Sequence, residues 1–69
     1  MAVARVTEII GSSNKSFDDA VKNAFERANK TLRNLTGLEI TKLNASINGG
    51  KIEEYRAHVK IIFILEDTM

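Results

Sequence analysis

The stretch Ser16–Leu35, SFDDAVKNAFERANKTLRNL, predicts an amphipathic helix and decides the fold class of the chain. Ser16 is a suitable N-cap, and Asp18 and Asp19 suit the positive end of the helix dipole. Apolar residues recur at intervals of three and four, which places them on one side of a helix: Phe17, Ala20, Val21, Ala24, Phe25, Ala28, Leu32 and Leu35. With Gly37 as the stop signal, we expect a helix of about five turns that packs on a sheet.

Strands are expected on both sides of this helix. The segment Ala2–Ile10 is rich in β-branched residues and is followed by the turn-forming run 11–14, GSSN. After the helix, two strands flank Asn48-Gly49-Gly50, a hairpin signal because Asn and Gly tolerate positive φ. If Asn48 and Gly49 are the turn residues, two cross-strand pairs follow, Leu38 with Val59 and Ile40 with Ala57. The sequence therefore predicts an α+β fold of order β-α-β-β, a three-stranded antiparallel sheet wrapped on one helix, in a single domain over 1–69.

The last strand, 53–65, EEYRAHVKIIFIL, separates into two faces by alternation. One face is apolar throughout and is expected to meet the helix: Ala57, Val59, Ile61, Phe63 and Leu65. The other face begins with Arg56, His58 and Lys60 and then changes to Ile62 and Ile64. A lone monomer would expose those two isoleucines to water, so this end of the sheet is expected to contact another subunit.

Composition narrows the possible functions. A chain of 69 residues is short of core, and with no cysteine and one histidine it has neither disulfides nor a zinc cluster for support, so self-association is expected. Lys and Arg number 10 against 9 acidic residues without a basic stripe, which argues against nucleic acid as a partner. Arg5 and Glu8 interrupt the apolar N-terminal segment, so we expect no signal peptide, no membrane partner and a cytoplasmic location. No nucleophile–base set can be assembled, and we expect no enzymatic activity.

The order of elements, the helix pattern S-F-x-x-A-x-x-x-A-x-x-R-A and the closing pattern Y-x-x-x-V-x-I-x-F together resemble the dodecins. The resemblance runs from Val6 to Leu65 and rests on these positions: Gly11, Ser13, Ser16, Phe17, Ala20, Ala24, Arg27, Ala28, Leu35, Glu39, Tyr55, Val59, Ile61 and Phe63. It implies a hollow homododecamer of cubic symmetry that stores and buffers flavins, without catalysis. It also implies that flavin pairs stack between tryptophans across two-fold axes.

Two positions depart from the family pattern. Gly37 stands where dodecins usually carry the tryptophan, and Arg56 stands where glutamine usually follows the tyrosine. Both are expected on the face of the sheet away from the helix, with Glu39, Thr41, His58 and Lys60 on the same face, and Leu38, Glu39 and His58 are expected to line the pocket. Gly37 offers no surface for stacking, and Arg56 donates hydrogen bonds but cannot accept one. We therefore expect a weakened site for FMN or riboflavin.

Two alternatives remain open within the same shell. Some dodecin-like proteins that lack the tryptophan and carry arginine after the tyrosine are described as calcium-binding. Calcium takes six to eight oxygen ligands, and the chain contains no EF-hand loop. Adjacent acids that a symmetry axis could gather are Glu53-Glu54 and Glu66-Asp67, of which Glu53 and Glu54 are the first candidates. The other alternative is a structural oligomer with a vestigial pocket.

Overall fold

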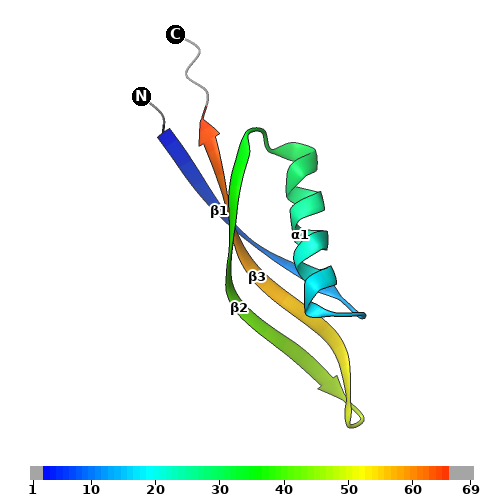
Figure 1. Cartoon of the computed structure of the whole chain (residues 1–69). Coiled ribbons are helices and arrows are strands. Elements are labelled where there is room, and N and C mark those ends of the chain that lie inside the picture. Colours follow the sequence, from blue (N-terminus) through cyan, green and yellow to red (C-terminus); the bar gives the residue numbers. More distant parts are fainter. Residues whose placement is uncertain (1–2, 66–69) are drawn as a thin grey trace.

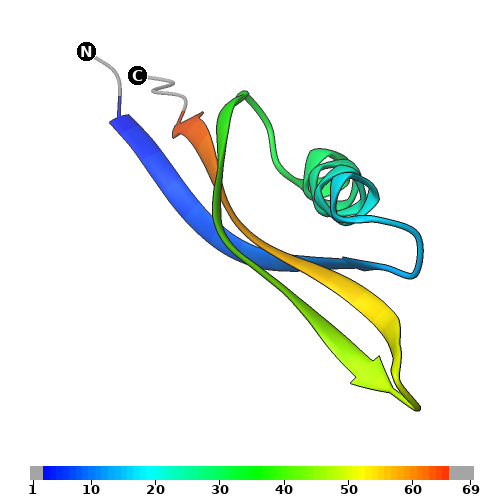
Figure 2. The ribbon, with the colours of Figure 1, turned by 60° about the horizontal axis from the view of Figure 1, so that its bottom comes forward.

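The chain folds in the predicted order β-α-β-β (Figure 1). A computed structural model describes residues 3–65, and comprises β1 (Val3–Ser13), α1 (Phe17–Thr31), β2 (Leu35–Asn48) and β3 (Lys51–Leu65). The sheet is antiparallel throughout and has the strand order β1-β3-β2, so the last strand is the central one. The helix lies against one face of the curved sheet and leaves the other face open (Figure 2). The predicted fold class is confirmed.

The core lies between α1 and the central strand. Its buried residues are three alanines spaced four apart on the helix and four from alternate positions of β3: Ala20, Ala24, Ala28, Ala57, Val59, Ile61 and Phe63. The predicted apolar face of β3 is thus confirmed at four positions, whereas Leu65 is exposed because it lies at the strand end. The alanine stripe brings the helix close to the sheet, since small side chains permit a short distance between the two layers.

The first strand continues beyond the predicted end at Ile10. β1 extends to Ser13, and Gly11 lies inside it, buried beneath the helix instead of in a turn. A Cβ added at Gly11 would overlap the carbonyl oxygen of Ala20 and lie 2.7 Å from the Ala24 Cβ. Gly11 is therefore required by the close contact between strand and helix. Ala2, the predicted first residue of this strand, lies outside the described residues.

The helix begins as predicted and ends earlier. Ser16 caps it by accepting a hydrogen bond of 3.0 Å from the Asp19 backbone N–H. The chain leaves the helix after Thr31, and Asn34, at φ 61°, occupies the left-handed region that Asn tolerates. Leu35 already belongs to β2, where it pairs with Phe63. The prediction of a helix through Leu35 with a stop at Gly37 was wrong. Leu35 fits the spacing of apolar residues in a helix, but it pairs with Phe63 in the sheet instead.

The hairpin register differs from the predicted one by two residues. The turn residues are Gly49 and Gly50, both at positive φ, and Asn48 pairs with Lys51. Leu38 consequently lies opposite Ile61, not Val59, and Ile40 opposite Val59, not Ala57. A shift of two residues keeps Leu38 and Ile40 on their expected faces.

An irregularity between Ile40 and Lys42 leaves Thr41 without a partner in the ladder. Thr41 donates instead a 3.1 Å hydrogen bond from Oγ1 to the His58 carbonyl. Beyond this bulge the alternation is reversed, so that Lys42 and Asn44, and not Thr41, share a face with the even-numbered residues of β3.

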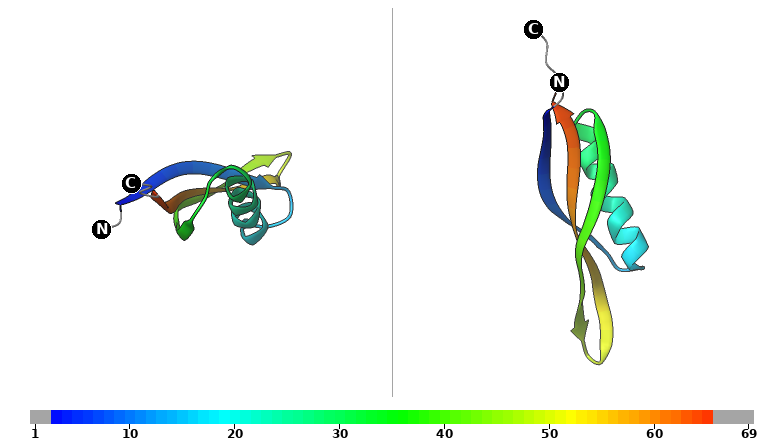
Figure 3. Two further views of the ribbon diagram at one scale, coloured as in Figure 1. Left: turned by 90° about the horizontal axis from the view of Figure 1, so that it is seen from above. Right: turned by 60° about the vertical axis from the view of Figure 1, so that its left-hand side comes forward.

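The far end of the hairpin projects from the body of the molecule. β1 ends at the Ser13–Tyr55 pair, so the segment Ser46–Glu54, hereafter the hairpin arm, has neither the third strand nor the helix beside it (Figure 3). The folded chain is accordingly elongated, with extents of 56 × 19 × 13 Å.

Candidate functional site

The open face of the sheet, which points away from α1, carries four of the five predicted ligand-binding positions: Gly37, Glu39, Arg56 and His58. Even-numbered residues of β3 point to this face, together with their partners on both neighbouring strands. Four rows of three residues follow one another along the strands: Val6·Ile62·Gly37, Glu8·Lys60·Glu39, Ile10·His58·Lys42 and Ser12·Arg56·Asn44. An apolar row at one end therefore gives way to charged and polar rows.

Gly37 and Arg56 lie on this face but far from each other. Gly37 pairs with Ile62, and Ile62 is three rows from Arg56 along β3. At about 3.3 Å per residue, the two positions are separated by about 20 Å. One subunit therefore does not bring together the two residues that replace the tryptophan and the glutamine.

Arg56 is already engaged by an acid. Its Nε donates a 2.7 Å hydrogen bond to Glu54 Oε1, and both side chains are partly exposed. This ion pair joins a residue predicted for flavin to a residue predicted for calcium. The signal was present in the sequence, because opposite charges two residues apart on a strand lie on the same face.

His58 also has a side-chain partner. Its Nε2 lies 3.0 Å from Asn44 Nδ2, and Asn44 reaches this position because the bulge at Thr41 has reversed the alternation of β2. Sequence reasoning missed Asn44 for that reason. Glu39 is exposed on the open face opposite Lys60.

Leu38 points to the opposite side from the other predicted pocket residues. It pairs with Ile61 and packs against the core beneath the helix. At the edge of β2 a hollow opens that both Gly37 and Leu38 line, along with Phe25, Leu35, Thr36 and Ile61. Gly37 thus stands where the open face meets this edge.

Next to Gly37 the open face is apolar and uncovered. Val6 is 51% exposed, and Ile62 and Ile64 are partly exposed beside it. These three residues, hereafter the open-face patch, include the two isoleucines that the alternation of β3 placed there. In the single chain they face solvent. Ile10, which is 61% exposed, lies two rows away beside His58.

Within residues 3–65, no group of three or more His, Cys, Asp or Glu side chains is placed to hold a metal ion. Of the candidate calcium ligands, Glu54 pairs with Arg56, and Glu53 accepts a 3.2 Å hydrogen bond from Asn48 Nδ2. Glu66 and Asp67 lie outside the described residues. A cation site based on Glu53 and Glu54 would need oxygen ligands from further copies of the chain.

The described part of the chain also contains no helix long and apolar enough to cross a membrane.

Comparison with known proteins shows which family has this sequence and fold. The sequence profile of the dodecin family matches residues 3–66. A dodecin of Thermus thermophilus is 32% identical over 66 residues, which cover 96% of each protein. The structure of the Streptomyces coelicolor dodecin superimposes with a TM-score of 0.93 at 37% identity, over 97% of this chain and 96% of that one. A calcium-chelating antigen of Mycobacterium tuberculosis, described as a calcium dodecin with a novel calcium-binding site, gives a TM-score of 0.82 at 25% identity, over 97% and 96% of the two chains.

The fold is a small β-α-β-β unit with one helix on one face of its sheet and an open second face. The chain belongs to the dodecin family, as its resemblance to dodecins predicted. Family membership supports a small ligand-binding protein.

Proposed function

We propose that this dodecin forms a hollow homododecamer that binds and stores a small ligand where open faces of neighbouring subunits meet, with a phosphorylated flavin as the favoured ligand class. The observation that carries the proposal is the open-face patch next to Gly37. Apolar surface of this kind marks a contact site. The separation of about 20 Å between Gly37 and Arg56 suits a pocket that draws them from different subunits. We further propose a single domain that acts in the cytoplasm and performs no catalysis.

Assembly is tested by Ile64→Asp. Ile64 points to the open face, away from the core beneath the helix, so the subunit fold should tolerate the change. Burial of an isoleucine in a contact contributes about 1.5–3 kcal/mol, and the contact would be repeated in every subunit of the shell. We expect the variant to sediment as monomers or small oligomers with its circular dichroism retained. A wild-type protein that sediments as a stable monomer would contradict the proposed assembly.

The ligand class is tested by titrating the wild-type protein with FMN and riboflavin. The Glu54 contact uses Nε of Arg56, and a guanidinium has four further N–H donors that could meet a phosphate. Without a tryptophan at position 37, riboflavin is expected to bind no more tightly than the micromolar range, and FMN more tightly than riboflavin. Because the contact is electrostatic and exposed, high salt should remove the preference for FMN. Equal binding of the two flavins at low salt would contradict a role for Arg56 in ligand binding.

Calcium is the second candidate, favoured by the similarity to the calcium dodecin and by the adjacent Glu53 and Glu54. If several copies gather these carboxylates, the melting temperature of the assembled protein should rise with calcium concentration, since calcium would bind the folded state. Replacing both residues by glutamine should abolish the rise, whereas Glu26→Gln on the exposed side of α1 should preserve it. The same melting curve in millimolar calcium and in chelator would remove this candidate.

A further inference from the structure

We propose that Asn48 is a site of spontaneous chemical modification, at which the side-chain amide is lost as ammonia and a carboxylate takes its place. Asn48 is the last residue of β2, and Gly49 follows it as the first residue of the turn. The site therefore lies at the tip of the hairpin arm (Figure 3). The reaction needs only water, so the proposal depends neither on the assembly nor on the ligand proposed above.

The backbone nitrogen of the following residue carries out the first step. The Gly49 nitrogen loses its proton to hydroxide and attacks Cγ of Asn48. The Cγ–Nδ2 bond breaks, and the amide nitrogen leaves as ammonia after it takes a proton from water. Water then opens the resulting cyclic imide at either of its carbonyls, which gives aspartate or isoaspartate. The whole reaction consumes one water and releases one ammonia, and nothing is oxidised or reduced.

Position 49 favours this attack because it has no side chain. Glycine leaves its own nitrogen unshielded, and its backbone is less restricted than that of any other residue. Space around the turn is also open, since a Cβ added at Gly49 or Gly50 would meet no atom of residues 3–65 within 4 Å apart from its chain neighbours. Asn48 itself is exposed, so water reaches both reacting groups.

The ring closes only when Asn48 leaves its strand conformation, because an extended backbone turns the next nitrogen away from the side chain. Asn48 and Lys51 form the last pair before the turn. The arm has neither β1 nor α1 beside it, and a two-stranded ribbon of this kind is marginally stable in water. Local opening of such a segment costs far less than unfolding of the whole chain. The arm therefore permits the conformation that the reaction requires.

One contact restrains the reaction. A register shift after Ser46 leaves Glu53 out of the strand pairing, and its Oε2 accepts a 3.2 Å hydrogen bond from Asn48 Nδ2. This contact holds the amide in one position. It also increases the electron density of the amide, which makes Cγ a poorer target for the attacking nitrogen. We therefore expect Glu53 to slow the loss of ammonia.

The product would change the tip of the arm. A carboxylate at position 48 would repel Glu53, which the amide of Asn48 had bound. Isoaspartate would in addition insert a carbon atom into the backbone beside the pair with Lys51. Either product loosens the turn and adds negative charge next to the candidate calcium ligands.

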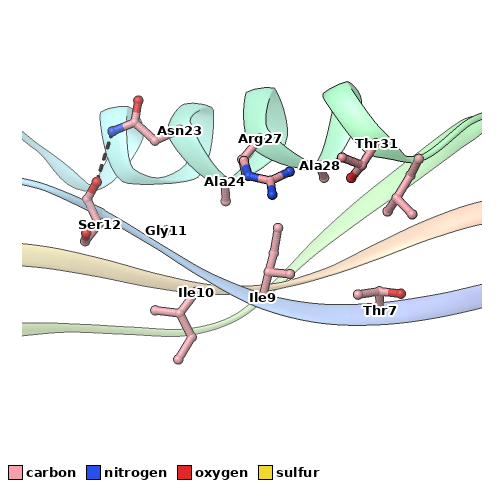
Figure 4. Close-up of a pocket in the computed structure, with 11 residues that line it drawn as sticks. Thr7, Ile9, Ile10, Gly11, Ser12, Asn23, Ala24, Arg27, Ala28 and Thr31 are labelled. Atoms are coloured by element: carbon pink, nitrogen blue, oxygen red, sulfur yellow. Dashed lines mark hydrogen bonds between the residues drawn. The ribbon is translucent and has the colours of Figure 1, made fainter.

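Other asparagines of the chain serve as internal controls. Asn23 lies inside α1, and its Nδ2 donates a 2.9 Å hydrogen bond to the Ser12 carbonyl (Figure 4). Asn44 lies in the three-stranded part of the sheet, with its Nδ2 3.0 Å from His58 Nε2. Neither asparagine precedes a glycine, and the backbone of each is held by a helix or by the sheet.

The first test is to incubate the purified protein at mildly alkaline pH and to follow its peptides by mass spectrometry. Exchange of NH2 for OH raises the mass of a peptide, and enzymatic methyl labelling distinguishes isoaspartate from aspartate. We expect Asn48 to react about tenfold faster than Asn23 and Asn44, or more, because Gly49 lacks a Cβ. The rate should rise with pH, since hydroxide removes the proton of the attacking nitrogen. Equal rates at the three asparagines would overturn the proposal, and this comparison needs no variant.

Gly49→Ala and Gly50→Ala form a matched pair of variants. Both glycines have positive φ, 62° and 78°, and both face open space, so either change strains the turn in a similar way. Only Gly49→Ala places a methyl group next to the attacking nitrogen. We expect Gly49→Ala to slow the reaction several-fold, and Gly50→Ala to leave it as fast as in the wild type or faster. A reaction in Gly49→Ala that is at least as fast as in Gly50→Ala would overturn the proposal.

Glu53→Ala tests the restraint. Loss of this carboxylate frees the Asn48 amide, so we expect the reaction to accelerate several-fold. The control is Glu54→Ala, which removes the same charge from a residue that pairs with Arg56 instead, and it should leave the rate unchanged. A rate in Glu53→Ala no higher than in Glu54→Ala would overturn the role assigned to Glu53.

Discussion

Gly11→Ala is expected to cause the largest loss of stability of any single methyl group added to this chain. The new Cβ would overlap the backbone carbonyl oxygen of Ala20 and lie 2.7 Å from the Ala24 Cβ, so the helix itself would have to move away from β1. Overpacking of a core costs about 1–3 kcal/mol and occasionally more, and here a backbone atom, not a flexible side chain, stands in the way. For a subunit with so small a core, we expect the transition in urea to shift strongly to lower concentration or to disappear.

Gly37→Ala is the matched control. A Cβ at Gly37 would meet the Ile62 Cδ1 at 3.3 Å, and this terminal methyl group can move. We expect a change well under the cost of Gly11→Ala when both variants are unfolded in urea at one protein concentration, which is held fixed because assembly contributes to the measured stability. Equal midpoints for wild type and Gly11→Ala would show that helix and sheet lie further apart in solution.

The double change Gly37→Trp with Arg56→Gln is expected to give the largest gain in ligand binding. The indole supplies a stacking surface, which by analogy with nucleic-acid bases is worth about 1–3 kcal/mol per contact, or about ten- to a hundredfold in affinity. The amide supplies the hydrogen-bond acceptor that arginine lacks. Gly37 is not at positive φ, and the nearest obstacle is the end of Ile62, so the strand should accommodate the larger residue.

The measurement is a titration of riboflavin followed by quenching of flavin fluorescence. Each single variant should gain less than the double one, and the FMN preference should be lost with Arg56. Nanomolar riboflavin binding by the unmodified chain would contradict the assignment of the pocket, as would an assembled double variant that binds no better than wild type.

Local sequence patterns predicted those parts of the fold where the pattern of residues fits only one kind of secondary structure. Ser16 starts the helix as expected, and the strict alternation from Ala57 to Phe63 identified the face that α1 covers. The end of the helix was mispredicted because Leu35 satisfies the helical period and strand pairing equally well, and only contact with Phe63 decides between them. Gly11 was assigned to a turn because no sequence pattern distinguishes a glycine packed closely against a helix from a glycine in a turn.

For the open face, the sequence predicted which residues share the face, but not the bulge in β2 or the distances between the residues. Alternation along β3 placed Arg56 and His58 on one face, and the two-residue error in hairpin register before the bulge left Gly37 and Glu39 on that same face. The bulge at Thr41 could not be read from the sequence, and it brings Asn44 to His58. Distance along the sheet was also not evident, so residues assigned to one pocket proved to lie at opposite ends of a face.

The wide spacing of Gly37 and Arg56 along β3 has a consequence for genetics. If pockets join these positions from different subunits, complementation between alleles becomes possible. Shells assembled from a mixture of two chains, one with only Gly37→Trp and the other with only Arg56→Gln, would contain some sites that carry both changes. The fraction of such sites would depend on the mixing ratio, so a mixed population could bind flavin better than either pure parent, although no single polypeptide in it carries a complete site.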